Sequence, residues 1–149
     1  MPINYVHRQD IEEFDGSLYS YQKLATRTAI YPGQGTPMGL IYVALKMNGE
    51  AGELAEHIGK AMRDDDLIRQ YDIYDFRTGE LTDSNSFQNG ELAPERREKI
   101  IKEIGDVLWY LSAACNELGI TLSEAAIVNL EKLASRTERG TLQGSGDDR

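Results

Sequence analysis

Two pairs of carboxylates in this chain have the residue types and the spacing of a metal site. Glu50 and Glu53 are three residues apart, and so are Glu103 and Asp106. Residues three apart lie on one face of a helix, so each pair would project from one side of its helix. Carboxylate oxygens are the hard ligands that Mg²⁺ and Mn²⁺ prefer. The sequence therefore offers a candidate Mg²⁺ site, in which Mn²⁺ can substitute.

Both pairs have the same angular relation to the apolar stripe of their own helix. At about 100° per residue, the first carboxylate of each pair lies roughly 80–90° from the centre of the stripe, and the second roughly 140–150°. If both stripes enter one core, Glu50 and Glu103 can face each other across a groove, where cations would offset their repulsion. Alternatively, each pair is only a solvated helix face, and spacing alone does not decide.

Polar side chains near these pairs suggest a phosphate ligand and a base. Lysine and arginine beside a metal site can neutralise phosphate charge, although ordinary surface charge is the alternative. The candidates continue the acidic helix face or form a stripe at i, i+3, i+7 on the last helix: Lys60, Arg63, Asn129, Lys132 and Arg136. Stacking or hydrogen bonding to a base is possible for others: Tyr19, Gln22, Tyr31 and Trp109, the last also being a candidate core residue.

Composition excludes several classes of protein. The chain has 149 residues and a net charge of −9, which argues against binding to nucleic acid or anionic membranes. The single cysteine, Cys115, permits no internal disulfide and is expected in the core. We expect neither a signal peptide nor a membrane span, because the first residues lack an apolar core and no stretch approaches the ~18 apolar residues of a span. These features predict a cytoplasmic protein.

Other catalytic constellations are missing. The two histidines, His7 and His57, have no serine or cysteine arrangement of a nucleophilic triad. A di-iron four-helix protein would carry Glu-x-x-His motifs, which the ligand helices lack. No Gly-rich phosphate loop of the kinase type occurs.

Hydrophobic periodicity predicts an all-α chain of four helices. Their expected ranges are 18–30, 38–63, 94–117 and 122–138. Ser17 is a candidate N-cap, and Thr121-Leu-Ser-Glu124 is a capping box. On the last helix, Ile127, Leu130 and Leu133 are among the residues expected to face the core.

The remaining segments are expected to be connections. Residues 1–16 form a loose lead-in, and about residues 64–93 form a loop or small hairpin inserted between the second and third helices. Residues 1–140 make one domain, followed by a flexible tail over 141–149. Three glycines, 49, 52 and 59, lie inside the second helix and indicate either close helix packing or approach of a backbone or ligand.

The two acidic motifs resemble those of the MazG-like, all-α nucleoside triphosphate pyrophosphohydrolases. The likeness includes Asn48-Gly-Glu-Ala-Gly-Glu53, with Lys60 following, Glu103-Ile-Gly-Asp106, the last helix from Asn129 to Arg136, and the Arg139-Gly-Thr-Leu-Gln-Gly-Ser-Gly-Asp ending. It covers about residues 18–146 except the insertion, which is often shorter in the family. The resemblance implies a four-helix MazG-like bundle of the short phage or bacterial type, in the host cytoplasm if phage-encoded.

The resemblance also implies an activity. A (deoxy)nucleoside triphosphate would be hydrolysed to the monophosphate and pyrophosphate by a homo-oligomer, a dimer or a dimer of dimers. The four carboxylates would hold Mg²⁺, with Glu53 as a possible proton acceptor, and the polar residues above would hold the phosphates. A dGTP preference, as in the MazZ group, is one expectation, and dUTP or dCTP cleavage is its rival. A non-catalytic acidic interaction protein is the alternative from another class.

Overall fold

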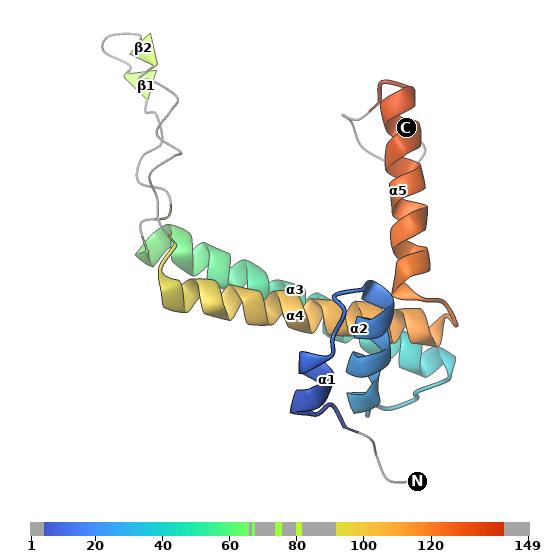
Figure 1. The fold of residues 1–149 in the computed structure, drawn as a ribbon. Helices are drawn as coiled ribbons and strands as arrows, with labels where there is room; N and C mark the ends of the chain where they lie inside the picture. Colours follow the sequence, from blue (N-terminus) through green and yellow to red (C-terminus); the bar gives the residue numbers. More distant parts are fainter. Residues whose placement is uncertain (1–4, 66, 68–73, 76–79, 82–91, 142–149) are drawn as a thin grey trace. The chain divides into compact units, whose positions relative to one another are not determined.

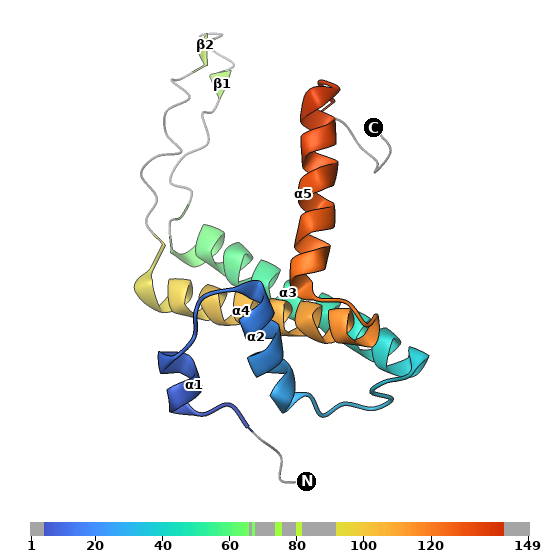
Figure 2. The same cartoon turned by 45° about the vertical axis from the view of Figure 1, so that its right-hand side comes forward.

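The protein is seen in a computed structural model that describes residues 5–65, 67, 74–75, 80–81 and 92–141. Helices dominate these residues, which confirms the all-α class. Figures 1 and 2 show the elements, which are α1 (Arg8–Glu12), α2 (Leu18–Ala25), the 3₁₀ turn η1 (Thr26–Thr28), α3 (Pro37–Asp64), β1 (Tyr74–Asp75), β2 (Glu80–Leu81), α4 (Pro94–Glu117) and α5 (Leu122–Glu138).

The predicted helix ends are set by local capping. The Ser17 hydroxyl accepts a hydrogen bond from the Ser20 amide at 3.1 Å. At α5, the Glu124 amide donates to the Thr121 hydroxyl at 3.0 Å, and the Glu124 carboxylate accepts from the Thr121 amide at 2.6 Å. Gly119 follows α4 with a φ of +68°, a conformation that glycine adopts without steric cost. The first predicted helix is shorter than expected, since it turns into a 3₁₀ helix at Thr26.

The segment expected to be a loose lead-in contains a helix. The amide of His7 donates to the Asp10 carboxylate at 2.8 Å, which caps α1. Arg27, just after α2, donates to the other oxygen of Asp10 at 2.9 Å. Five residues are too few to form a stable isolated helix, so α1 depends on this contact with a distant part of the chain.

The chain divides into two compact units. One contains residues up to Lys46 together with those from Leu108 onward, and the other runs from Met47 to Val107. Because α3 and α4 each contribute to both units, their halves are described separately below.

In the unit formed by the two chain ends, Gln22 joins three elements. Its side-chain amide donates to Asn116 at 2.7 Å and to the carbonyl of Ile120 at 3.1 Å. Its amide oxygen accepts from the buried backbone amide of Leu122 at 2.7 Å. Gln22 is 5% exposed, so these bonds satisfy a buried polar group. They connect α2 to the end of α4 and to the start of α5.

The loop before α3 is held by Glu117. Its carboxylate accepts from the Tyr31 hydroxyl at 2.6 Å and from the Gly35 amide at 3.0 Å. Burial and this acidic partner raise the pKa of Tyr31, which therefore remains a protonated donor. Tyr31 stacks on Tyr42 with ring centroids 5.8 Å apart. A Cβ on Gly39 would lie 2.5 Å from the Gly33 carbonyl, so this loop can pack against α3 only because residue 39 is glycine.

In the other unit, the second half of α3 and the first half of α4 run antiparallel side by side (Figures 1 and 2). Ala61 on α3 and Ile100 on α4 are buried here. Beyond α3, Tyr74 pairs with Leu81 and Asp75 with Glu80 in an antiparallel hairpin, as the sequence suggested. Most of the predicted insertion over 64–93 lies outside the described residues, as does the predicted tail after Thr141.

One expectation about the core is wrong. Ile127, Leu130 and Leu133 of α5 were expected to be buried, but they are 53%, 63% and 39% exposed. Their helical spacing gives them a common face without specifying what covers that face. Cys115, by contrast, is buried as expected, and burial raises the pKa of its thiol. Among the described residues, no helix has the length and apolar character needed to cross a lipid bilayer.

Candidate active site

Three of the four predicted carboxylates come together in the unit from Met47 to Val107. Glu50 on α3 and Glu103 and Asp106 on α4 each have an oxygen within 4.8 Å of the others. Glu50 and Glu103 are partly buried, whereas Asp106 is exposed. Three like charges at this distance repel one another, and a divalent cation would remove that repulsion. The oxygen-only donor set fits a hard ion such as Mg²⁺ or Mn²⁺.

The two helices present their carboxylates in the same order of burial. The first carboxylates of the two motifs, Glu50 and Glu103, are partly buried, and the second ones, Glu53 and Asp106, are exposed. This is the order expected from their angles to the apolar stripes. Glu53 is not in the group of three, so its part in metal binding stays a prediction.

His57 is the residue of this region that sequence reasoning passed over. Its Nε2 lies 3.7 Å from Oε1 of Glu103, and the two side chains are only 18% and 14% exposed. Its Nδ1 is buried and has no hydrogen-bond partner among the described residues. The sequence did contain a signal, because residue 57 follows Glu50 by two helical turns and therefore lies on the same face of α3.

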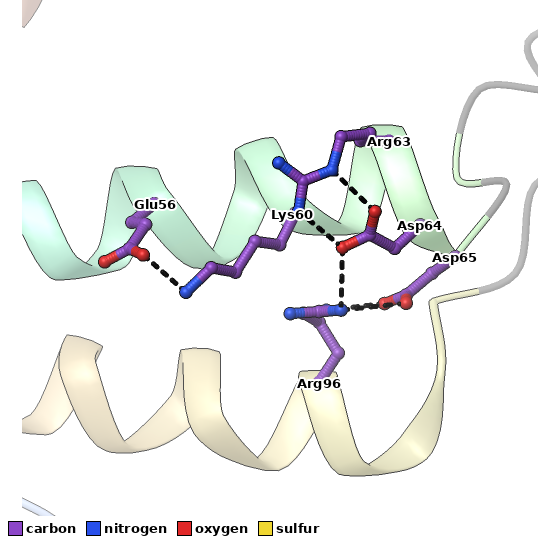
Figure 3. Close-up of polar contacts among 6 residues, drawn as sticks. All are labelled: Glu56, Lys60, Arg63, Asp64, Asp65 and Arg96. Carbon is purple, nitrogen blue, oxygen red and sulfur yellow. Dashed lines mark hydrogen bonds and ion pairs between the residues drawn. The ribbon is translucent and has the colours of Figure 1, made fainter.

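The predicted phosphate ligands of α3 already have acidic partners (Figure 3). Lys60 forms an ion pair with Glu56, one turn earlier, and this contact lowers the pKa of Glu56. Arg63 donates to both oxygens of Asp64, at 2.6 and 2.8 Å. Exposed ion pairs contribute little stability, so both cations can exchange these carboxylates for a phosphate at small cost.

Arg96 connects the two ends of the insertion (Figure 3). From the first turn of α4 it donates Nε and Nη2 to the two oxygens of Asp65, at 2.6 and 2.9 Å. Its Nη2 also lies 4.0 Å from Asp64. Hydrogen bonding to Arg96 lowers the pKa of Asp65. This bidentate pair joins the residue after the end of α3 to the first turn of α4.

The remaining predicted ligands belong to the unit formed by the two chain ends. Asn129 and Lys132 are exposed on α5, and Arg136 is 7% exposed. Gln22 uses its amide in the three hydrogen bonds described above, and Tyr31 donates its hydroxyl to Glu117. Contacts of Gln22 or Tyr31 with a base therefore remain a prediction, and they would have to compete with these bonds.

The glycines of α3 are not explained by helix packing. A Cβ placed on Gly49, Gly52 or Gly59 would meet no atom of the described residues within 4 Å. The same holds for Gly105, between the two carboxylates of α4. Of the two explanations offered from the sequence, close packing within the described part of the chain therefore does not account for these glycines. Approach of a ligand to the exposed backbone remains open.

Comparison with known proteins assigns a family to this arrangement. The sequence model of one protein family, the MazG nucleotide pyrophosphohydrolase domain, matches residues 42–141. These residues contain both acidic motifs and α5. The chain is also 39% identical over 132 residues to the Gene 37 protein of Mycobacterium phage L5, covering 87% of this chain and 96% of that protein. No solved structure gives a significant match. Gln22 and Tyr31 precede the matched domain.

Proposed function

The chain belongs to the MazG nucleotide pyrophosphohydrolase family, and on that basis we propose that it uses a divalent metal ion to split a (deoxy)nucleoside triphosphate into the monophosphate and pyrophosphate. Family membership makes the protein a nucleoside triphosphate pyrophosphohydrolase. The alternative of a non-catalytic acidic interaction protein is thereby excluded. Metal dependence, metal identity and nucleotide preference are the parts that we propose.

One observation carries the proposal. Oxygens of Glu50, Glu103 and Asp106 converge within 4.8 Å, from two helices of the domain that the family model matches. The mutual repulsion of these carboxylates is unfavourable, and a cation close to them would compensate it. A bound Mg²⁺, or Mn²⁺ in its place, supplies that compensation.

The chemistry follows from this donor set. When bound, the ion supplies Lewis acidity toward phosphate oxygens and lowers the pKa of a bound water. Water adds to the α- or the β-phosphorus. The bond from that phosphorus to the bridging oxygen breaks, and the bridging oxygen leaves with the other phosphate. Glu53 is exposed on α3, three residues after Glu50, and we assign it the role of taking the proton from the attacking water.

The cationic residues are proposed to hold the phosphates. Lys60 and Arg63 would exchange Glu56 and Asp64 for phosphate oxygens. Asn129, Lys132 and Arg136 would contribute from α5, whose residues lie within the matched domain. Positive charge directed at the departing pyrophosphate stabilises the charge that develops during cleavage.

Guanine is the proposed base, with dGTP as the first substrate to test. The phage origin of the 39% identical relative agrees with the short phage type that the sequence resembles, and with activity in a host cytoplasm. The rival preference is dUTP or dCTP. We also propose a homo-oligomer, since Ile127 and Leu130, on one face of α5, are 53% and 63% exposed.

A nucleotide panel tests the function. The purified chain is incubated with each dNTP and NTP in the presence of Mg²⁺ or Mn²⁺, and monophosphate and pyrophosphate are quantified by anion-exchange chromatography. We expect equimolar products, fastest from dGTP and dependent on the metal. Glu103→Gln should abolish activity, whereas Lys102→Gln, at an exposed neighbouring position, should retain it.

Three results would count against parts of this proposal. Turnover that persists in excess chelator would contradict metal dependence. Equal rates for wild type and Glu103→Gln would contradict the site. Faster cleavage of dUTP or dCTP than of dGTP would replace the guanine preference by its rival.

A further inference from the structure

We propose that His57 is a positioning residue for Glu103, holding that carboxylate in the orientation in which it faces Glu50 and Asp106. The inference rests on the proposed metal site, to which it adds a supporting side chain. His57 itself is not in the group of three, so its role is exerted through Glu103.

The geometry places Glu103 between two residues of α3. Glu50 and His57 are seven residues apart, and at about 100° per residue they project within roughly 20° of each other. Both approach Glu103, Glu50 through the shared acidic group and His57 through Nε2 at 3.7 Å from Oε1. Glu103 is therefore flanked on the α3 side by one carboxylate and one imidazole.

The surroundings of the His57 imidazole argue that this side chain does more than fill space. Its Nδ1 is buried and has no partner among the described residues, and a buried polar atom of this kind calls for an explanation. An apolar side chain would fill the same space without leaving that atom unsatisfied. The contact that distinguishes histidine from an apolar residue here is the one between Nε2 and Glu103.

The contact to Glu103 is made through Nε2. To donate to the carboxylate, the imidazole must carry a hydrogen on Nε2, the nitrogen that lies nearer to Glu103. The 3.7 Å separation is an ion-pair distance, longer than a closed hydrogen bond. Contacts of this kind are often long in ligand-free enzymes and shorten in the loaded state. Partners behind metal ligands orient those ligands and tune affinity for the ion.

Substitutions of two lengths separate this role from simple packing. The side-chain nitrogen of glutamine reaches about as far from the backbone as Nε2 of histidine, while that of asparagine reaches only as far as Nδ1. His57→Gln therefore keeps a donor for Glu103, His57→Asn keeps a polar group without that reach, and His57→Leu keeps only bulk. Lys102→Gln serves as the matched control beside Glu103.

The measurement is Mn²⁺ affinity of the full chain without nucleotide, by titration calorimetry and by electron paramagnetic resonance of free Mn²⁺. We expect His57→Leu and His57→Asn to weaken binding about tenfold or more, the range found for residues that support metal ligands. His57→Gln should stay within about threefold of wild type, and Lys102→Gln should be unchanged. Thermal unfolding of each variant is recorded in parallel, and we expect no loss for His57→Leu.

The outcomes separate the two proposals. Wild-type Mn²⁺ affinity in His57→Leu, or equal weakening in the glutamine and asparagine variants, overturns the role of His57 alone. If His57→Leu fails to fold, the glutamine and asparagine pair still decides the question. A wild-type chain that binds no Mn²⁺ contradicts the metal site itself, together with everything that depends on it.

Discussion

Carboxylates of the same chemical type have different surroundings in this site. Glu50 and Glu103 are partly buried and converge with Asp106, while Glu53 is exposed outside the group. A ligand must approach the ion closely, whereas a proton acceptor must keep its charge available to water. We therefore propose a division of labour in which the three converged carboxylates hold the ion and Glu53, already expected from the sequence as a possible proton acceptor, takes the proton.

This division can be measured with two substitutions. Glu53→Gln removes a base without removing one of the three converged ligands, so kcat should fall by about 10²-fold or more while Mn²⁺ affinity stays within about threefold of wild type. Glu103→Gln should instead lose Mn²⁺ affinity, as seen by calorimetry. If Glu53→Gln lost as much Mn²⁺ affinity as Glu103→Gln, Glu53 would be a ligand and the base would have to be sought elsewhere.

At the scale of elements, α2, α4 and α5 depend on the buried amide of Gln22. Gln22→Leu would leave the buried amide of Leu122 without its acceptor and remove two further bonds. We expect a loss of about 3 kcal/mol in the free energy of unfolding, measured by urea denaturation. A variant with normal stability but a raised KM would show instead that Gln22 acts mainly on the nucleotide.

The pair between Asp65 and Arg96 gives the helix ends a pH dependence. The folded state lowers the pKa of Asp65, so the pair stabilises the fold above the ordinary aspartate pKa of about 3.9 and loses this effect as the pH falls through the lowered value. Arg96→Gln should therefore lower the unfolding midpoint most near neutral pH, with the difference from wild type vanishing in strong acid. The measurement is thermal unfolding followed by circular dichroism across that range.

Its control is Lys102→Gln, which removes an ion pair with Glu98 that is exposed on both sides. Exposed pairs contribute little stability, so this variant should follow wild type at every pH. A difference for Arg96→Gln that did not shrink toward acid would mean that Arg96 stabilises the fold by packing and not through the aspartate.

For the whole molecule, the exposed apolar residues of α5 predict self-association. Ile127→Asp combined with Leu130→Asp places charges on the face that these two residues share, and should yield particles of the 16.7 kDa chain mass. Wild type should sediment as a multiple of that mass. Sedimentation equilibrium measures both, with Glu131→Gln as a control on the same helix. A monomeric wild type would contradict the proposed assembly.

Local chemistry by itself determined the helices and the candidate ligands. Ser17 and Thr121 cap helices through bonds within three residues, and the apolar periodicity of α3 and α4 is equally local, so both could be predicted from sequence. The pairing of acidic residues three apart followed from the helical repeat alone. The ranking of their burial followed from angles to the apolar stripe.

Tertiary structure decided what depends on contacts between distant residues. The helix α1 is held by Arg27, and Gln22 satisfies atoms about a hundred positions away, which no local pattern encodes. The converged oxygens of Glu50, Glu103 and Asp106, and the place of His57 behind Glu103, exist only because α3 and α4 pack antiparallel. Sequence spacing fixes directions within one helix, while distances between helices arise from packing. For that reason the candidate residues could be predicted from the sequence, whereas the fold determines which of them lie close together.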